Sequence, residues 1–210
     1  YVFNFSVIAL MIVFQPEVRR ALEQIGRSGL RKGFGLVQKE EDMEKEKRRC
    51  IQAVSEAADN FQRSKTGALI VFERETKLGD IIDTGTVVNA IPSVPLIGNI
   101  FWNKAPLHDG AMVIRESMVY AAGCILPLTK SDTVSIDLGT RHRAGIGMSE
   151  NSDAVILIVS EETGQISLAV NGRLTRNYSK ETLQEALEGY LLTEEKAERR
   201  IPSLRRIKKQ

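Results

Sequence analysis

Cysteine and histidine are scarce in this chain of 210 residues, and their scarcity excludes several kinds of site. The two cysteines, Cys50 and Cys124, lie far apart in the sequence, so the chain has neither a disulfide framework nor a CxxC metal pair. The two histidines, His108 and His142, are equally scattered, and four isolated residues are a poor basis for structural zinc. We expect both cysteines to be free thiols, buried or half-buried in a reducing compartment.

An excess of charge of one sign is also missing. The 29 Lys and Arg residues nearly balance the 27 Asp and Glu residues, which leaves a formal net charge of +2. Bulk charge therefore gives no support for nucleic-acid binding. Hydrophobic residues make up 42% of the chain and charged residues 27%, a balance that can bury a substantial core and excludes a wholly disordered chain. We expect one domain with additional helices, or at most two small domains.

An uncharged stretch opens the chain. Residues 1–14 are apolar apart from Asn4 and Ser6. Because a bilayer-spanning helix needs about 20 apolar residues, we interpret residues 1–15 as the end of a transmembrane helix, and the start at Tyr1 as the start of a fragment. A signal peptide has no support, since no basic region precedes the stretch and no small-residue cleavage site follows it. A buried helix of a soluble domain is the alternative.

Basic residues follow the apolar stretch closely, and an excess of this kind marks the cytoplasmic flank of a membrane span. We expect residues 16–37 to form a juxtamembrane helix and a Gly-rich linker, with the following domain on the cytoplasmic side. Residues 193–210 form a charged, basic C-terminal tail. The basic residues of the N-terminal flank are Arg19, Arg20, Arg27, Arg31 and Lys32.

The hydrophobic pattern of residues 38–192 predicts a single α/β domain. Apolar residues at spacings of three and four predict a helix over 38–64, with Ile51, Val54, Ala58 and Phe61 toward a core. Short apolar runs predict strands near 67–74, 111–114, 118–126, 154–159 and 165–170. Helices are expected over 93–102 and 180–192, the second capped by Ser179. We therefore expect a central mixed β-sheet flanked by helices.

A carboxylate with small neighbours forms the first candidate site, in the segment Leu107-His108-Asp109-Gly110-Ala111. Gly110 and Ala111 have no bulky side chains, so a ligand could approach the carboxylate closely. Carboxylates are the ligands that Mg²⁺ and Mn²⁺ prefer. Asp-Gly is also a common tight-turn dipeptide, so a simple turn is the alternative.

Two further segments carry groups suited to phosphate. Thr140-Arg141-His142-Arg143 combines a hydroxyl, two guanidiniums and an imidazole, which are donors for phosphate oxygens. If Thr140 caps a helix, the backbone N–H groups of the first turn add to this set; the alternative is a solvated basic loop. Ser160-Glu161-Glu162 places a hydroxyl and carboxylates after a predicted strand, either beside a metal-bound phosphate or simply in a polar turn.

The order of segments along residues 38–190 resembles the catalytic domain of the diadenylate cyclases. These segments read GALIVFER, LHDGA, AAGCILPL, GTRHR and IVSEETG, and Asp-Gly-Ala and Arg-His-Arg are the defining motifs of that family. The apolar N-terminal stretch and the charged helix after it are similar to the membrane-anchored bacterial subclass. The resemblance implies a nucleotidyltransferase that condenses two ATP molecules into cyclic di-AMP, a second messenger, with release of two pyrophosphates.

The resemblance also implies a role for each motif residue. Asp109 would hold a divalent metal, Mg²⁺ or Mn²⁺, and help to activate the ribose 3′-hydroxyl, with His108 as a further ligand. Gly110 and Ala111 would keep one wall of the site flat, and His142 would contact phosphate or orient its neighbours. Ile125 stands where some relatives carry an aromatic residue. The residues implied to bind ATP are Thr140, Arg141, Arg143, Ser160 and Glu162 at the phosphates, and Leu69 and Leu126 beside adenine.

Partners follow from the same resemblance. The product is twofold symmetric and the motifs supply one ATP site per chain, so we expect a homodimer to be needed for catalysis. The subclass further implies membrane attachment through N-terminal helices, a membrane-bound regulator and a phosphoglucosamine mutase, and no nucleic acid. Two alternatives stay open: a nucleotide-binding regulatory module without turnover, and a membrane-tethered interaction domain whose basic tail docks on anionic lipid.

Overall fold

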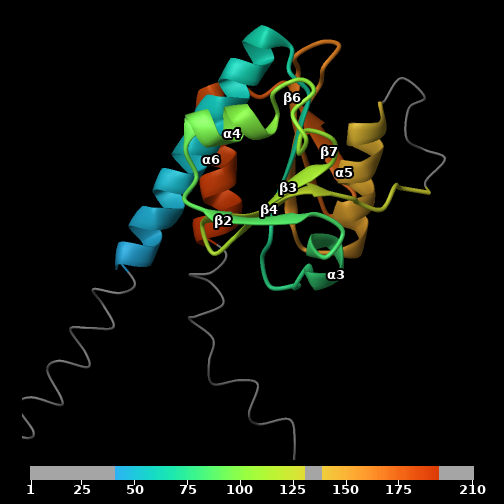
Figure 1. Cartoon of the computed structure of the whole chain (residues 1–210). Helices are drawn as coiled ribbons and strands as arrows, with labels where there is room; N and C mark the ends of the chain where they lie inside the picture. Colours follow the sequence, from blue (N-terminus) through green and yellow to red (C-terminus); the bar gives the residue numbers. More distant parts are fainter. Residues whose placement is uncertain (1–40, 131–138, 194–210) are drawn as a thin grey trace, which may run out of the picture. The chain divides into compact units, whose positions relative to one another are not determined.

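The computed structural model describes residues 41–130 and 139–193 (Figure 1). The chain divides into two units, Tyr1–Lys45 and Glu46–Gln210, and the first contributes only the helical residues 41–45 to the described part. The predicted membrane segment 1–15, the linker 16–37 and the tail from residue 194 lie outside the described residues. Within the described ranges, no helix is both long enough and apolar enough to cross a bilayer.

A mixed sheet forms the centre of the second unit, as predicted, and it has seven strands. The strand order is β2-β4-β3-β1-β5-β6-β7. β1 and β3 run parallel, and every other neighbouring pair is antiparallel. The strands are β1 (Ala68–Phe72), β2 (Thr86–Ala90), β3 (Ala111–Arg115), β4 (Met118–Cys124), β5 (Val155–Val159), β6 (Ile166–Val170) and β7 (Arg173–Arg176).

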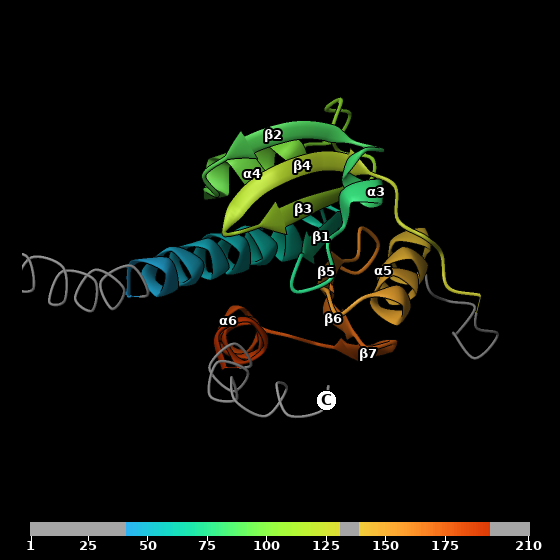
Figure 2. The ribbon, with the colours of Figure 1, turned by 90° about the horizontal axis from the view of Figure 1, so that it is seen from below.

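Helices cover both faces of this sheet (Figure 2). The helical residues 46–64, α4 (Val94–Ile100) and α6 (Lys180–Glu188) pack on one face, and α3 (Gly79–Ile82) and α5 (Thr140–Asn151) pack on the other. α6 continues into a π-helical turn, Gly189–Thr193. All five residues of β1 are buried. Alternate side chains of a strand enter opposite cores, so a strand covered on both faces is apolar throughout.

The helices that the sequence predicted form where their caps and apolar stripes require. Residues 41–64 are helical, and the predicted stripe of Ile51, Val54, Ala58 and Phe61 is buried. Ser93 caps α4 by accepting a hydrogen bond from the Leu96 N–H, with a proline in the first turn. Ser179 caps α6 in a capping box with Thr182. These caps end the preceding loops and fix where each helix starts.

Four elements were not predicted: α3, α5, β2 and β7. β2 is an edge strand that is largely exposed and carries a register shift, so its sequence lacks the buried-strand pattern. α5 contains Gly145 and Gly147, which disfavour a helix on propensity alone. Packing explains both glycines, because an added Cβ would lie 2.8 Å from Ile158 Cδ1 at Gly145 and 2.4 Å from the Pro127 carbonyl oxygen at Gly147.

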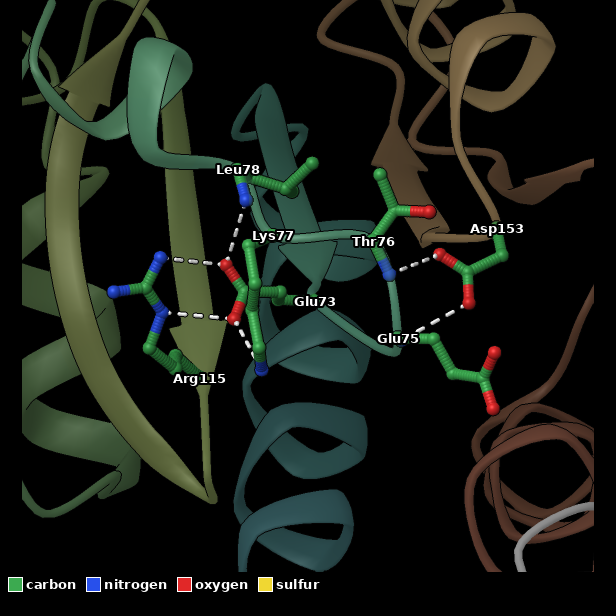
Figure 3. Close-up of polar contacts among 7 residues, drawn as sticks. All are labelled: Glu73, Glu75, Thr76, Lys77, Leu78, Arg115 and Asp153. Atoms are coloured by element: carbon green, nitrogen blue, oxygen red, sulfur yellow. Dashed lines mark hydrogen bonds and ion pairs between the residues drawn. The ribbon is translucent and has the colours of Figure 1, made fainter.

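A buried carboxylate fixes the connection between β1 and α3 (Figure 3). Glu73 follows β1, and its side chain is 1% exposed. Arg115 donates to this carboxylate through Nε at 2.8 Å and through Nη2 at 2.7 Å. The Leu78 N–H donates to it at 3.0 Å, and Lys77 Nζ donates to it at 3.2 Å. Burial alone would raise the pKa of Glu73, but these hydrogen bonds outweigh it and hold the pKa below its usual value.

Asp153, two residues before β5, fixes the same connection (Figure 3). Its carboxylate accepts the backbone N–H groups of Glu75 and Thr76, each at 3.0 Å. These bonds outweigh the effect of burial and lower the pKa of Asp153. Glu73 and Arg115 stand at the carboxyl ends of β1 and β3, whereas the Asp-Gly-Ala motif leads into the amino end of β3. Glu73, Arg115 and Asp153, which we name the carboxylate cluster, therefore lie at the opposite end of the sheet from that motif.

Candidate active site

Three segments that are far apart in the sequence reach the same end of the sheet. We name them the DGA segment (109–111), the RHR segment (141–143) and the SEE segment (160–162), and we name this end of the sheet the motif end. The DGA segment leads into β3, which is parallel to β1, and the SEE segment follows β5, which is antiparallel to β1. The strand register aligns these ends through the pairs Ile70–Met112 and Ala68–Val159.

The RHR segment begins helix α5. Gly139 occupies the N-cap position with an extended backbone and no side-chain cap, so the condition considered for Thr140, that it caps a helix, is not met. Thr140 is the first helical residue, and it is exposed. The backbone of Gly139 makes the cap because its carbonyl accepts the N–H groups of His142 and Arg143 at 3.1 and 3.2 Å. The positive end of the helix dipole thus lies at the RHR segment.

Arg141 reaches from α5 to the SEE segment. Its Nη1 donates to Glu161 Oε2 at 2.7 Å. Its guanidinium also lies against Gly67, directly before β1, where an added Cβ would be only 2.9 Å from Arg141 Cζ and Nη1. Arg141 lines a cavity of about 420 Å³ together with His108 and Trp102. The structure therefore brings the RHR and SEE segments together with the residue that precedes the DGA segment.

The turn into β3 explains the glycine of the DGA segment. Gly110 has a φ of 111°, and an added Cβ would lie 2.7 Å from the carbonyl carbon of Gly123. Only glycine fits such a close approach with a positive φ. Ala111 is completely buried. Asp109 is exposed, and within the described part of the chain its carboxylate has no hydrogen bond or ion pair.

His108 is oriented by the backbone. Its Nδ1 lies 2.6 Å from the Ala105 carbonyl oxygen, a contact that requires the proton on Nδ1 and leaves Nε2 as the acceptor or metal-ligating nitrogen. Among residues 41–130 and 139–193, no three His, Cys, Asp or Glu side chains come close enough to hold a metal ion together. His108 and Asp109 could thus supply only part of a metal's coordination shell.

The other two residues of the RHR segment have different surroundings from Arg141. His142 is 8% exposed, and burial, followed by the positive charge of Arg176, lowers the pKa of His142, although Glu162 acts in the opposite direction. Arg143 is exposed, and its backbone carbonyl accepts the Thr129 N–H at 3.0 Å. Of the three residues, only Arg141 lines the 420 Å³ cavity.

Ser160 shapes the turn between β5 and β6. Its Oγ accepts the backbone N–H groups of Glu162 and Thr163, each at 3.3 Å, so the SEE segment does form a polar turn. Because Oγ acts there as an acceptor, its own proton stays available to a ligand oxygen. Glu161 and Glu162 are exposed on this turn.

The leucines predicted beside adenine belong to the hydrophobic core. Leu69 is 4% exposed and Leu126 is 7% exposed, and both pack in the cluster beneath α5. Their neighbour Ile125 is 68% exposed, and its N–H donates to Thr84 Oγ1 at 2.9 Å. The apolar surface offered to a base at this end of the strands therefore includes Ile125.

Three residues of the site were not singled out from the sequence: Gly67, Glu161 and Trp102. Gly67 was assigned only to the start of a strand, and Glu161 stood beside two residues that were chosen. Trp102 is the one tryptophan of the chain and is 72% exposed. Exposure of so large an apolar side chain could not be read from the sequence, although the rarity of tryptophan was visible.

Comparisons with known proteins cover most of the chain. Residues 55–174 match the family model described as DisA bacterial checkpoint controller nucleotide-binding. Cyclic di-AMP synthase CdaA of Bacillus subtilis is 44% identical over 185 residues, which are 88% of this chain and 66% of that protein. A diadenylate cyclase of Listeria monocytogenes is 40% identical over 190 residues, which are 90% of this chain and 68% of that protein. The chain thus spans about two thirds of the length of these relatives.

The fold has a solved counterpart. The crystal structure of a double mutant of DacA from Staphylococcus aureus matches with a TM-score of 0.68 at 45% identity, covering 70% of this chain and 99% of that one. The residues matched by the family model include the DGA, RHR and SEE segments. The motifs, their meeting at one end of the sheet and these matches lead to one conclusion: the chain belongs to the diadenylate cyclase (DAC) family.

Proposed function

We propose that this chain condenses two ATP molecules into cyclic di-AMP with release of two pyrophosphates, as an enzyme of second-messenger signalling. The observation that carries the proposal is the meeting of the DGA, RHR and SEE segments at the motif end, with Arg141 extended between them. The names of two relatives, cyclic di-AMP synthase and diadenylate cyclase, agree with this product.

We assign phosphate binding to the first turn of α5 and to the turn after β5. Arg141 and Thr140 stand where the helix dipole favours negative charge, and Arg143 adds an exposed guanidinium. Ser160 can donate its hydroxyl proton to a phosphate oxygen, with Glu162 beside it. In the reaction a ribose 3′-oxygen attacks the α-phosphorus in line, and pyrophosphate leaves on the opposite side. These residues position the triphosphate and neutralise its charge.

Asp109 and His108 are the residues that would hold a divalent ion, Mg²⁺ or Mn²⁺. An exposed carboxylate without a partner in the described chain suits such an ion, and the contact of His108 Nδ1 with a carbonyl directs Nε2 to the ligand role. Since the described residues supply no third ligand nearby, the remaining positions suit phosphate and water oxygens. When bound, the ion supplies electrostatic stabilisation of the transferring phosphoryl group.

We assign adenine binding to the part of the motif end beside Gly110, Ala111 and Ile125. Gly110 and Ala111 keep the backbone beside Asp109 low, and Leu69 and Leu126 form the core beneath. Exposed Ile125 supplies the apolar contact surface. His142 is neutral at neutral pH because its pKa is lowered, so in this proposal it orients the first turn of α5 and carries no charge to the phosphate.

We place the domain on the cytoplasmic side of a bacterial membrane, acting as a homodimer. The membrane placement rests on the apolar residues 1–14 and the basic residues after them, together with the resemblance to the anchored subclass. The membrane regulator and the phosphoglucosamine mutase rest on that resemblance alone. The homodimer follows from the symmetry of the product, because each chain supplies one set of motif segments.

Incubation of the purified chain with ATP and Mn²⁺ or Mg²⁺, with products identified by mass, tests the reaction. We expect one cyclic di-AMP and two pyrophosphates for every two ATP consumed. ATP binding without pyrophosphate release would instead establish a silent nucleotide-binding module. A chain that binds no ATP but sediments with anionic vesicles, and loses this on deletion of residues 194–210, would establish a lipid-docking domain.

A further inference from the structure

We propose that Glu161 and Gly67 are positioning residues that hold Arg141 in the geometry needed for phosphoryl transfer. Neither of them touches the reacting atoms in this proposal; both act through the guanidinium. The inference deepens the proposed function and rests on it, since it assumes that Arg141 serves the triphosphate. Its basis is the set of contacts around the Arg141 side chain.

The Arg141 guanidinium packs against Gly67. An added Cβ at this position would be 2.9 Å from Arg141 Cζ, 2.9 Å from Nη1 and 3.1 Å from Glu161 Cβ. These are contacts that a real Cβ cannot make without displacing its neighbours, and its nearest neighbour is the far end of the Arg141 side chain. Gly67 also directly precedes β1, a completely buried strand, so its backbone is fixed. Any larger residue would therefore displace Arg141 rather than the sheet.

Glu161 holds the guanidinium from the other side. Oε2 accepts from Nη1 at 2.7 Å, a short charge-assisted bond. A guanidinium has five N–H donors, so this bond leaves the remaining donors for phosphate oxygens. Arg141 is only 23% exposed, whereas Glu161 is 62% exposed. The pair therefore holds a half-buried arginine by its tip at the wall of the 420 Å³ cavity.

The charge of Glu161 distinguishes a positioning role from a binding role. A carboxylate at this place repels the triphosphate and so weakens ground-state binding of ATP. In this proposal its benefit comes from orientation, because a misplacement of about 1 Å can cost up to about 100-fold in rate. Loss of Glu161 should thus lower kcat while the KM for ATP stays the same or falls. A loss of folded protein would lower the apparent kcat whether or not Arg141 is present, so the dependence of the loss on Arg141 separates positioning from support of the fold.

The test is a set of double-mutant cycles with kcat, KM and ATP affinity as readouts. In the parent chain, Glu161→Ala and Gly67→Ala should each lower kcat by about 10- to 100-fold. Glu161→Gln keeps an oxygen acceptor and should retain kcat within about threefold. In an Arg141→Ala chain, Glu161→Ala and Gly67→Ala should each change kcat by less than about twofold. Where turnover of that chain is too slow to measure, ATP affinity from calorimetry should likewise change by less than about twofold.

Matched controls exclude general damage. Gly98→Ala lies in α4, where an added Cβ meets nothing within 4 Å, and Glu116→Gln lies in the exposed turn after β3; both should leave kcat and KM unchanged. Equal losses from Glu161→Ala with and without Arg141 would overturn the inference, as would a rise in KM without loss of kcat. A parent chain that binds ATP but makes no cyclic di-AMP would refute the proposed reaction. A double-mutant cycle of Gly67→Ala and Arg141→Ala, with ATP affinity as the readout, would still decide whether Gly67 positions Arg141.

Discussion

Asp109 has an exposed carboxylate that is unpartnered within the described chain. We expect Asp109→Asn to abolish cyclic di-AMP formation while ATP affinity stays within about tenfold, because many other groups bind the triphosphate. Radiolabelled product formation and calorimetric ATP binding measure the two effects. Glu116→Gln, at the opposite end of β3, is the control, and turnover by Asp109→Asn within about threefold of the parent would show the assignment to be wrong.

Arg141 and Arg143 test phosphate binding. Replacing either with Ala should cost about 1.5–3 kcal/mol in kcat/KM, the usual contribution of a hydrogen bond to a charged group. Arg49→Ala, an exposed arginine on the 41–64 helix, should change nothing. If kcat/KM stayed at the parent value in both RHR variants, the segment would be a solvated basic loop, and the proposed phosphate site would fail.

His142 gives the site a measurable pH signature. Burial and Arg176 hold the pKa of His142 below its usual value of 6.5. The unfolded chain therefore takes up this proton first, so the free energy of unfolding is unaffected above about pH 6.5 and decreases as the pH falls from there through the folded pKa. An NMR titration of the His142 ring should give the lowered pKa directly.

Replacement of the neighbouring charge provides the comparison for His142. Arg176→Gln removes a nearby positive charge and should raise the pKa of His142 toward 6.5. Arg173→Gln, at the other end of β7, should leave the titration unchanged. A pKa for His142 at or above 6.5 in the parent chain would contradict the described environment.

At the scale of elements, the connection between β1 and α3 depends on the buried Glu73 carboxylate (Figure 3). Glu73→Gln keeps the shape but loses the charge that matches Arg115, and should lower the free energy of unfolding by about 1–3 kcal/mol in urea titrations. Because hydrogen bonds hold the pKa of Glu73 below its usual 4.5, this stabilisation is present above about pH 4.5 and disappears as the pH falls through the folded pKa.

The adjacent carboxylate is the matched control for Glu73. Glu75 is exposed, and only its backbone N–H takes part in the connection, so Glu75→Gln should leave stability within about 0.5 kcal/mol of the parent. Equal stability of the Glu73→Gln and Glu75→Gln chains would mean that the carboxylate cluster does not hold this connection. Neither variant should alter KM for ATP, because the cluster lies at the opposite end of the sheet from the motif segments.

Helix α5 shows how far element prediction could go. Its sequence, TRHRAGIGMSEN, has no apolar stripe of the usual kind and contains two interior glycines. The sequence therefore indicated phosphate chemistry at this place without indicating the helix. The helix exists because Gly145 lets its backbone pack on Ile158 and Gly147 lets it pack on residues 127–129, contacts that no local pattern can reveal.

For the whole molecule, we expect catalysis to require two copies of the domain facing each other. Two identical linkages form between two nucleotides, and each 3′-hydroxyl must come within about 3–3.5 Å of the other α-phosphorus. A twofold dimer with opposed sites is the simplest arrangement, and membrane attachment would raise the effective concentration of the partners. Specific activity of the soluble chain should thus rise with enzyme concentration. Activity per molecule that stays constant on dilution far below the measured dimer dissociation constant would refute paired sites.

Mixing experiments complete that test. An Asp109→Asn chain mixed with an Arg141→Ala chain should not regain full activity, because each mixed dimer still contains defective sites. The parent chain mixed with either variant should lose activity as mixed dimers form. Full recovery in the first mixture would mean that one intact composite site is sufficient.

The sequence by itself determined the core strands, the capped helices and the identity of the chemical groups. Continuous apolar runs, helical spacing and serine caps are local signals that act through burial and backbone hydrogen bonds, and the strands β1, β3, β4, β5 and β6 and the helices α4 and α6 formed close to the predicted places. The motif residues Asp109, Arg141 and Ser160 were likewise visible as residue types suited to phosphate and metal.

Only the tertiary structure decided how those groups meet. The parallel pairing of β1 with β3 and the antiparallel pairing of β1 with β5 place the DGA and SEE segments at one end of the sheet, and the contact of Arg141 with Glu161 joins the RHR segment to them. Three features depend on partners that are remote in sequence: the edge strand β2, the glycine-containing α5 and the packing of Arg141 against Gly67. Local sequence patterns indicate burial and turns. Strand register and close backbone approach arise from long-range pairing, and for that reason these two features could not be read from the sequence.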